Sequence, residues 1–144
     1  MLEARLAVHL RKTQQRLKQM WREKIDEYNL TFRLLHILML ISNNPGASQK
    51  EIAQQLKFTP GAMSGSVKRL IELKMIEQIP LENDLRFNRL TVTEHGQAII
   101  KECKEQAEIR YKQIFADFTD GELNSFCQAL TKINTNLDAM EEKV

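Results

Sequence analysis

The sequence predicts a mainly α-helical protein of the α+β class, in which one short β-ribbon is set between helices. Apolar residues recur at spacings of three and four over most of the 144 residues, and strict alternation replaces this spacing only near residues 75–93. Capping residues and turn signals separate the segments. Hydrophobic residues make up 42% of the chain and charged residues 28%, which is typical of one globular domain or two small lobes.

The first two helices are expected at residues 3–27 and 31–43. The first has an apolar stripe with charged residues between its members. The second begins at Thr31, a suitable N-cap, and is apolar on almost every face. We therefore expect it to be the buried central helix, ended by the sequence NNPG at residues 43–46.

Two shorter helices follow, joined by a tight turn. The third starts at Ser48, where Glu51 completes a capping box. Thr59 caps the fourth, and Pro60 takes its first position, where a missing N–H costs nothing. Four apolar residues of the fourth helix are expected to face inward: Met63, Val67, Leu70 and Ile71. Four small residues are expected to face outward: Gly61, Ser64, Gly65 and Ser66.

The alternating segments 75–81 and 86–93 are predicted to pair as antiparallel strands of a hairpin. Pro80 restricts this ribbon to the edge of a sheet because proline cannot donate a ladder hydrogen bond. A long helix is expected over 94–116. A last helix, capped at Thr119, has a heptad-like apolar seam.

This order of elements predicts a winged helix-turn-helix at residues 29–95, with an N- and C-terminal helical dimerisation lobe formed by residues 1–28 and 96–144. The terminal helices have apolar stripes that need something to bury them. A symmetric homodimer is the commonest way in which proteins bury such stripes.

The paired short helices favour binding to double-stranded DNA. The second helix of such a pair lies in the major groove, and small outward residues let its backbone approach bases and phosphates. Glycine within a helix costs up to about 1 kcal/mol relative to alanine, which close approach to another surface would explain. The alternative is a plain amphipathic helix that tolerates glycine. The residues predicted to bind DNA from the two helices are Ser48, Gln49, Thr59, Pro60, Gly61, Ser64, Gly65, Ser66, Lys68 and Arg69.

The predicted ribbon tip adds a second DNA-binding element. Arg86 is expected to enter the minor groove, where negative potential is strongest over narrow A·T-rich stretches. Asp84 is expected to orient an arginine, either Arg86 or another nearby. The alternative is a solvated surface pair that contributes little.

The segment DLRFNRLTVTEHG at residues 84–96 resembles the wing signature of the multiple-antibiotic-resistance regulator (MarR) family of bacterial transcription factors. The segments LLHILMLISNNPGAS, SQKEIAQQL and MSGSVKRLIELKMI are similar to the family's preceding helix, first motif helix and recognition helix. The motifs cover roughly residues 30–96, and helix order extends the likeness to the whole chain.

The resemblance implies a homodimer whose recognition helices read successive major grooves, about 34 Å apart, of a pseudo-palindromic operator. It also implies that the protein is a repressor, relieved by a small aromatic or amphipathic effector that shifts the spacing of the two helices. Two residues depart from the family pattern. Gly65 stands near a position where arginine is frequent, and Lys74 replaces the usual glycine before the first wing strand. Lys74 must then adopt a left-handed conformation, or the helix ends differently.

Polarisable residues on the predicted helices are candidates for the effector pocket: Trp21, His36, Met39 and Tyr111. Each of them, taken singly, is more typical of plain core, and a hydrogen-bonded structural role is the default for His36. The three histidines show no ligand spacing, so no metal is expected. No cofactor is predicted.

Two other functions stay open. Cys103 and Cys127 are compatible with a thiol-redox-responsive regulator of the same fold, although Cys127 adjoins the apolar seam, which favours a buried and inert thiol. A winged helix used only for protein contacts would not need Arg86 together with a small, basic-flanked helix. No glycine-rich phosphate loop, nucleophile elbow or paired acid–base motif suggests an enzyme.

Charge suggests a class of partner for the chain, and hydropathy suggests its location. The formal net charge is +2, but residues 1–24 hold seven basic and two acidic side chains. Such a basic flank suggests an anionic partner, although solvated charge on a helix face is the commoner reason for it. No apolar run reaches the length of a membrane span, and no signal-peptide core is present, so we expect no membrane partner and a cytoplasmic location.

Overall fold

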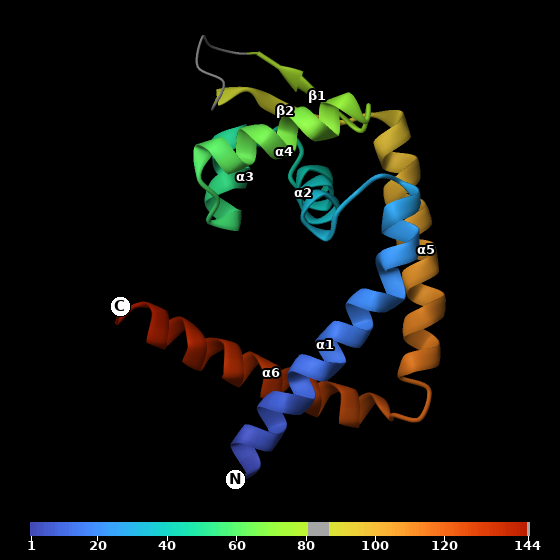
Figure 1. Ribbon diagram of the computed structural model, residues 1–144, viewed down its shortest axis with the longest axis vertical. Coiled ribbons are helices and arrows are strands. Elements are labelled where there is room, and N and C mark those ends of the chain that lie inside the picture. The colour runs from blue at the N-terminus through green and yellow to red at the C-terminus, as the bar shows by residue number, and fades with distance from the viewer. Residues whose placement is uncertain (81–86, 144) are drawn as a thin grey trace. The chain divides into compact units, whose positions relative to one another are not determined.

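The computed structural model describes residues 1–80 and 87–143 (Figure 1). The elements of this described part follow in the order α1 (Leu2–Glu27), α2 (Phe32–Asn43), α3 (Gln49–Leu56), α4 (Pro60–Glu72), β1 (Ile76–Ile79), β2 (Arg89–Val92), α5 (Glu94–Ile114) and α6 (Asp120–Glu141). The predicted fold class, mainly helical with a two-stranded antiparallel sheet, is confirmed. The chain divides into two compact units, Met1–Glu102 and Cys103–Val144. None of the described helices is long and apolar enough to cross a membrane.

The core of the first unit forms around α2, as its apolar composition predicts. Ile37 and Leu38 are completely buried, and they lie among side chains from α3, α4 and the sheet. The other fully buried large side chains of this core are Ile52, Met63, Val67, Leu70, Met75, Ile76 and Leu90. Ile71 was expected in the inward face of α4, but it is 37% exposed because it lies at the edge of the apolar stripe, beside Leu70. That expectation was wrong.

The predicted N-caps are confirmed at three helices of this unit. Thr31 Oγ1 accepts a hydrogen bond from Leu34 N at 3.1 Å, and Thr59 Oγ1 accepts one from Ala62 N at 3.2 Å. Ser48 and Glu51 form the complete capping box of α3. These side chains satisfy N–H groups that the first turn of a helix leaves without partners.

The ends of α1, α3 and α4 lie at residues in the left-handed conformation, and none of these residues is glycine. They are Asn29 (φ 58°), Lys57 (φ 56°) and Lys74 (φ 59°). After α4, Met75 N donates to Leu70 O at 3.0 Å and Lys74 N donates to Ile71 O at 2.9 Å, the paired bonds of a Schellman motif. Lys74, which stands where the family usually has glycine, therefore adopts the left-handed conformation, the first of the two options expected from the sequence.

The wing strands are shorter than predicted but pair as expected. The register places Ile76 opposite Val92 and Ile79 opposite Arg89. β1 ends just before Pro80, which has no N–H to continue the ladder. The base of the wing is also attached to the start of α3, because Ser48 and Arg89 form an antiparallel bridge and Gln49 N donates to the Asn88 carbonyl at 2.9 Å.

The threonine and glycine of the wing signature connect the end of α4 to the start of α5. Thr93 Oγ1 donates to the Lys74 carbonyl at 2.7 Å and accepts a hydrogen bond from Gly96 N at 3.0 Å. A Cβ atom on Gly96 would lie 2.2 Å from the Met75 carbonyl oxygen. Glycine is therefore required here by the close approach of two backbone segments.

An ion pair joins α1 to α5 within the first unit. Lys24 Nζ lies 2.5 Å from Glu102 Oε1 and 5.3 Å from the centre of the Tyr28 ring. Burial raises the pKa of Tyr28 to about 12. The hydrogen bond between Lys24 and Glu102 lowers the pKa of Glu102 below its ordinary value of 4.5 and raises the pKa of Lys24.

These shifts predict how the stability contribution of the pair depends on pH. The pKa of Glu102 is lower in the folded chain, so the contribution is present above pH 4.5 and is lost as the pH falls through the folded value. Because the pKa of Lys24 is raised, Lys24 stays charged and the stability contribution of the pair persists until strongly alkaline pH. We expect Glu102→Gln to melt slightly below the wild type at neutral pH, with the difference vanishing in acid. Thermal unfolding across pH checks this, and a difference that persists unchanged in acid would contradict it.

The second unit contains the end of α5 and the whole of α6. Thr119 and Glu122 form the predicted capping box of α6. Most side chains of α6 are exposed, including Cys127, so the expectation that Cys127 is a buried thiol was wrong. The seam of α6 has too few neighbours in this unit to bury it. Cys103 is buried.

Candidate nucleic-acid interface

One face of α4 presents small and basic residues to solvent. Gly61, Ser64, Gly65 and Lys68 are exposed, and their spacing of three and four places them on one side of the helix. We call these four residues the recognition surface. A Cβ atom on Gly61 or Gly65 would meet no atom of the chain within 4 Å. Internal packing therefore gives no reason for glycine at either position.

Ser66 does not belong to this surface. The residue is 9% exposed, and its Oγ donates to the Ala62 carbonyl at 3.1 Å within the helix. The expectation that Ser66 faces outward was wrong. It lies three residues after Met63 and four before Leu70, so the helical period already placed it on the buried side.

The remaining predicted contacts at the helix starts have structural roles. Ser48 is buried and its hydroxyl caps α3. Thr59 and Pro60 are exposed at the start of α4, where the Thr59 hydroxyl accepts the Ala62 N–H. The N-terminus of α4 directs the positive end of its helix dipole beside the recognition surface, which favours an anion there.

Gln49 was predicted to contact DNA, but in the structure it is buried. It is 4% exposed, and its Nε2 donates to Ser64 Oγ at 3.2 Å. Its Oε1 accepts a hydrogen bond from Gln78 Nε2 at 3.1 Å. Sequence reasoning missed Gln78, whose only signal was its alternation with Ile76 on the same face of β1.

Basic side chains lie on α4 and on the neighbouring elements α2, α3 and β2. Lys68 is exposed, and Arg69 forms a 3.5 Å ion pair with Glu72 one turn later. Arg33 lies 4.1 Å above the Phe58 ring, and Lys50 lies 5.6 Å from the centre of the Phe87 ring. A further ion pair, 3.6 Å long, joins Arg89 to Glu51 at the base of the wing. The predicted wing contacts, Asp84 and Arg86, lie outside the described residues.

The candidate effector residues differ in exposure. Trp21 on α1 and Met39 on α2 are half-buried, whereas His36 on α2 is exposed and Tyr111 on α5 is 45% exposed. The interpretation of His36 and Tyr111 as core residues is therefore wrong for the single chain. Among the described residues, no group of histidine, cysteine or carboxylate side chains is arranged to hold a metal ion.

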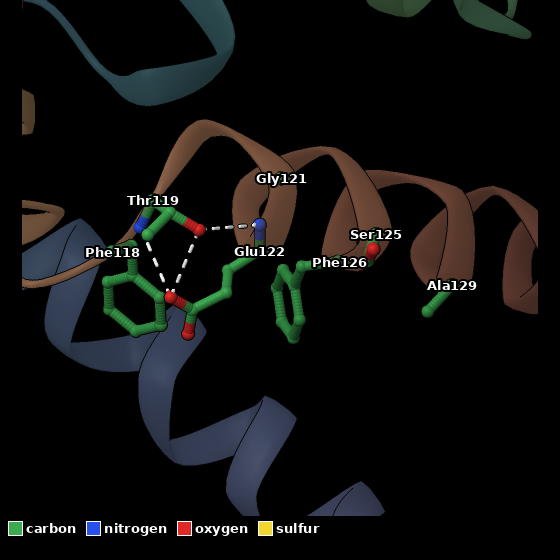
Figure 2. A pocket seen from close by; sticks show the side chains of 7 residues that line it. All are labelled: Phe118, Thr119, Gly121, Glu122, Ser125, Phe126 and Ala129. Atoms are coloured by element: carbon green, nitrogen blue, oxygen red, sulfur yellow. Dashed lines mark hydrogen bonds between the residues drawn. The ribbon is translucent and has the colours of Figure 1, made fainter.

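An open hollow of about 570 Å³ lies on the first turns of α6 (Figure 2). Figure 2 shows the aromatic rings of Phe118 and Phe126 on the same side of α6 as the Glu122 side chain. These two phenylalanines are 52% and 54% exposed. The residues that line the hollow are Phe118, Thr119, Gly121, Glu122, Ser125, Phe126 and Ala129.

Comparison with known proteins gives a consistent result. A family model described as MarR family matches residues 28–86. The transcriptional regulator ZitR of Lactococcus lactis subsp. cremoris is 30% identical over 109 residues, covering 72% of this chain and 74% of that protein. Two solved structures share the fold. Staphylococcus aureus MarR in complex with salicylate and kanamycin has a TM-score of 0.88 at 16% identity, covering 95% of this chain and 93% of the other. Streptococcus pneumoniae FabT in complex with DNA has a TM-score of 0.81 at 18% identity, covering 96% and 99%.

Proposed function

The chain belongs to the MarR family of transcriptional regulators, and we propose from this premise that it is a homodimeric repressor of pseudo-palindromic operators. Each recognition surface enters a major groove, and the two surfaces of the dimer read successive grooves on one side of the duplex. The structure of FabT was solved with DNA bound, which supports the same use of this fold here.

The observation that best supports DNA binding is the open space over Gly61 and Gly65. Two glycines in one helix lower its stability, by up to about 1 kcal/mol each relative to alanine. The chain itself gains no packing from them. A duplex seated against this face explains both, because the helix backbone then approaches the groove closely while Lys68 reaches a phosphate.

The dimer is supported by the exposed apolar side chains of the terminal helices. Large apolar residues are exposed on α1 and α6: Leu2, Leu6, Val8, Phe126, Leu137 and Met140. Isolated chains seldom expose this many on neighbouring turns of a helix. We assign residues 1–28 and 96–144 to dimerisation and 29–95 to DNA binding. A second copy then covers these side chains, including the phenylalanines of the hollow on α6.

A small aromatic or amphipathic effector releases the operator in this proposal. The solved complex of Staphylococcus aureus MarR with salicylate supports a ligand of this kind. The residues proposed to contact it are Trp21, His36, Met39 and Tyr111. Their incomplete burial leaves each of them accessible to a ligand.

Arg86 is proposed to enter the minor groove, and its replacement tests the wing. We expect Arg86→Ala to weaken operator binding about tenfold, because one charged groove contact is lost. The melting temperature and the mass of the dimer should stay as in the wild type. Fluorescence anisotropy with an operator duplex measures the affinity, and light scattering measures the mass. Unchanged affinity would place the wing contact elsewhere.

A further inference from the structure

Three polar side chains from three elements are joined by hydrogen bonds behind the recognition surface. Gln78 on β1 donates to Gln49 on α3 at 3.1 Å, and Gln49 donates to Ser64 on α4 at 3.2 Å. We call these three residues the polar relay. It connects the wing to an exposed hydroxyl on the recognition helix, although Gln49 itself is 4% exposed.

The backbone fixes both glutamines. Gln49 is the first residue of α3, directly after the Ser48 capping box, and its N–H donates to the Asn88 carbonyl at 2.9 Å. Gln78 pairs with Leu90 in the sheet and lies on the same face as the buried Ile76. A side-chain amide held at both ends by hydrogen bonds in a buried position has little freedom to turn.

The direction of these bonds determines what Ser64 presents to a partner. A serine hydroxyl has one hydrogen to donate and two lone pairs to accept. Gln49 Nε2 occupies a lone pair of Ser64 Oγ, and no described residue accepts the Ser64 hydrogen. That hydrogen is therefore left for an acceptor outside the chain, so Ser64 can act as a donor at the surface.

We propose that Gln49 and Gln78 are positioning residues that hold the Ser64 hydroxyl as a hydrogen-bond donor to an acceptor atom of operator DNA. This inference rests on the proposed DNA-binding function. Suitable acceptors in the major groove are N7 and O6 of guanine, N7 of adenine and O4 of thymine, and phosphate oxygens accept equally.

A double-mutant cycle tests the relay in the full-length protein. The probe is a duplex selected by the wild-type protein from a random-sequence library. We expect Gln49→Met and Ser64→Ala each to weaken binding about threefold to tenfold. In the Ser64→Ala background, Gln49→Met should cause no further loss, because the group that it positions is gone. Gln78 is half-buried, and Gln78→Met should weaken binding as Gln49→Met does. If Gln49→Met unfolds, the same cycle is measured with Gln78→Met.

A matched control uses another serine–glutamine pair of the same unit. Ser42 Oγ donates to Gln97 Oε1 at 3.5 Å between α2 and α5, and neither residue belongs to the recognition surface or to the polar relay. Gln97→Met should leave the affinity for the selected duplex unchanged. The same measurements on duplexes with one changed base pair identify the acceptor. Lost discrimination at one position per half-site indicates a base, and a uniform loss across sequences indicates a phosphate.

The outcomes separate this inference from the proposed function. Selection of a duplex by the wild type, with equal losses from Gln49→Met in both backgrounds, would overturn the relay and leave DNA binding intact. An unchanged affinity in Ser64→Ala would also overturn it. A wild-type protein that selects no sequence at all would overturn the proposed function and the relay together.

Discussion

Replacing Gly96 by alanine is expected to lower the free energy of unfolding by about 3 kcal/mol. The new Cβ would lie 2.2 Å from the Met75 carbonyl oxygen and 2.6 Å from a methyl group of Val92. Neither neighbour moves easily, since Met75 O accepts the Thr93 N–H and Val92 is paired with Ile76 in the sheet. Urea denaturation followed by circular dichroism measures the loss.

The control for this substitution is Gly65→Ala, which also adds one methyl group to a helix. Gly65 has no atom within 4 Å of the added Cβ, so this variant should be more stable than the wild type by up to about 1 kcal/mol. The opposite signs test whether the two glycines are present for different reasons. Equal stability of the two variants would contradict the close approach at Gly96.

Replacing Gly65 by glutamate is expected to reduce operator affinity on the order of 100-fold without loss of folding. The side chain has room within the chain, and glutamate is a better helix former than glycine. On the recognition surface it places bulk and a negative charge against the phosphates. Anisotropy titrations with the selected duplex measure the affinity, and thermal unfolding measures stability.

Ala98→Glu is the charge-matched control for Gly65→Glu. Ala98 is an exposed helical position on α5, so the variant changes net charge equally but leaves the recognition surface as it is. Its affinity should stay within about threefold of the wild type at moderate salt, where distant charges are screened. If the Gly65→Glu protein binds as tightly as the Ala98→Glu protein, the assignment of the DNA-binding face to α4 is contradicted.

The helices and their starts were predictable because their causes are local. Thr31, Ser48 and Thr59 each cap the helix that follows them, and these bonds span only three residues. The left-handed conformation of Lys74 was one of two options that the sequence left open. Its cause is the Schellman motif that ends α4.

The polar relay was not predictable because it depends on residues far apart in the chain. Gln49 and Gln78 are 29 positions apart, and only the packing of β1 and of α3 against α4 brings them to Ser64. The exposure of His36, Tyr111 and Cys127 was misjudged for a related reason. Each is in a helix with apolar neighbours in sequence, but burial depends on what the folded chain places against that side of the helix.

The central claim, that the recognition surface reads operator DNA, is tested most directly by the affinity of the purified wild type for duplex DNA from its own upstream region. Gel shifts at several salt concentrations, with nonspecific duplex as competitor, separate specific from purely electrostatic binding. We predict competitor-resistant binding of two protomers per site that survives moderate salt. Binding that competitor abolishes, together with failure to select any sequence from a random library, would contradict the claim.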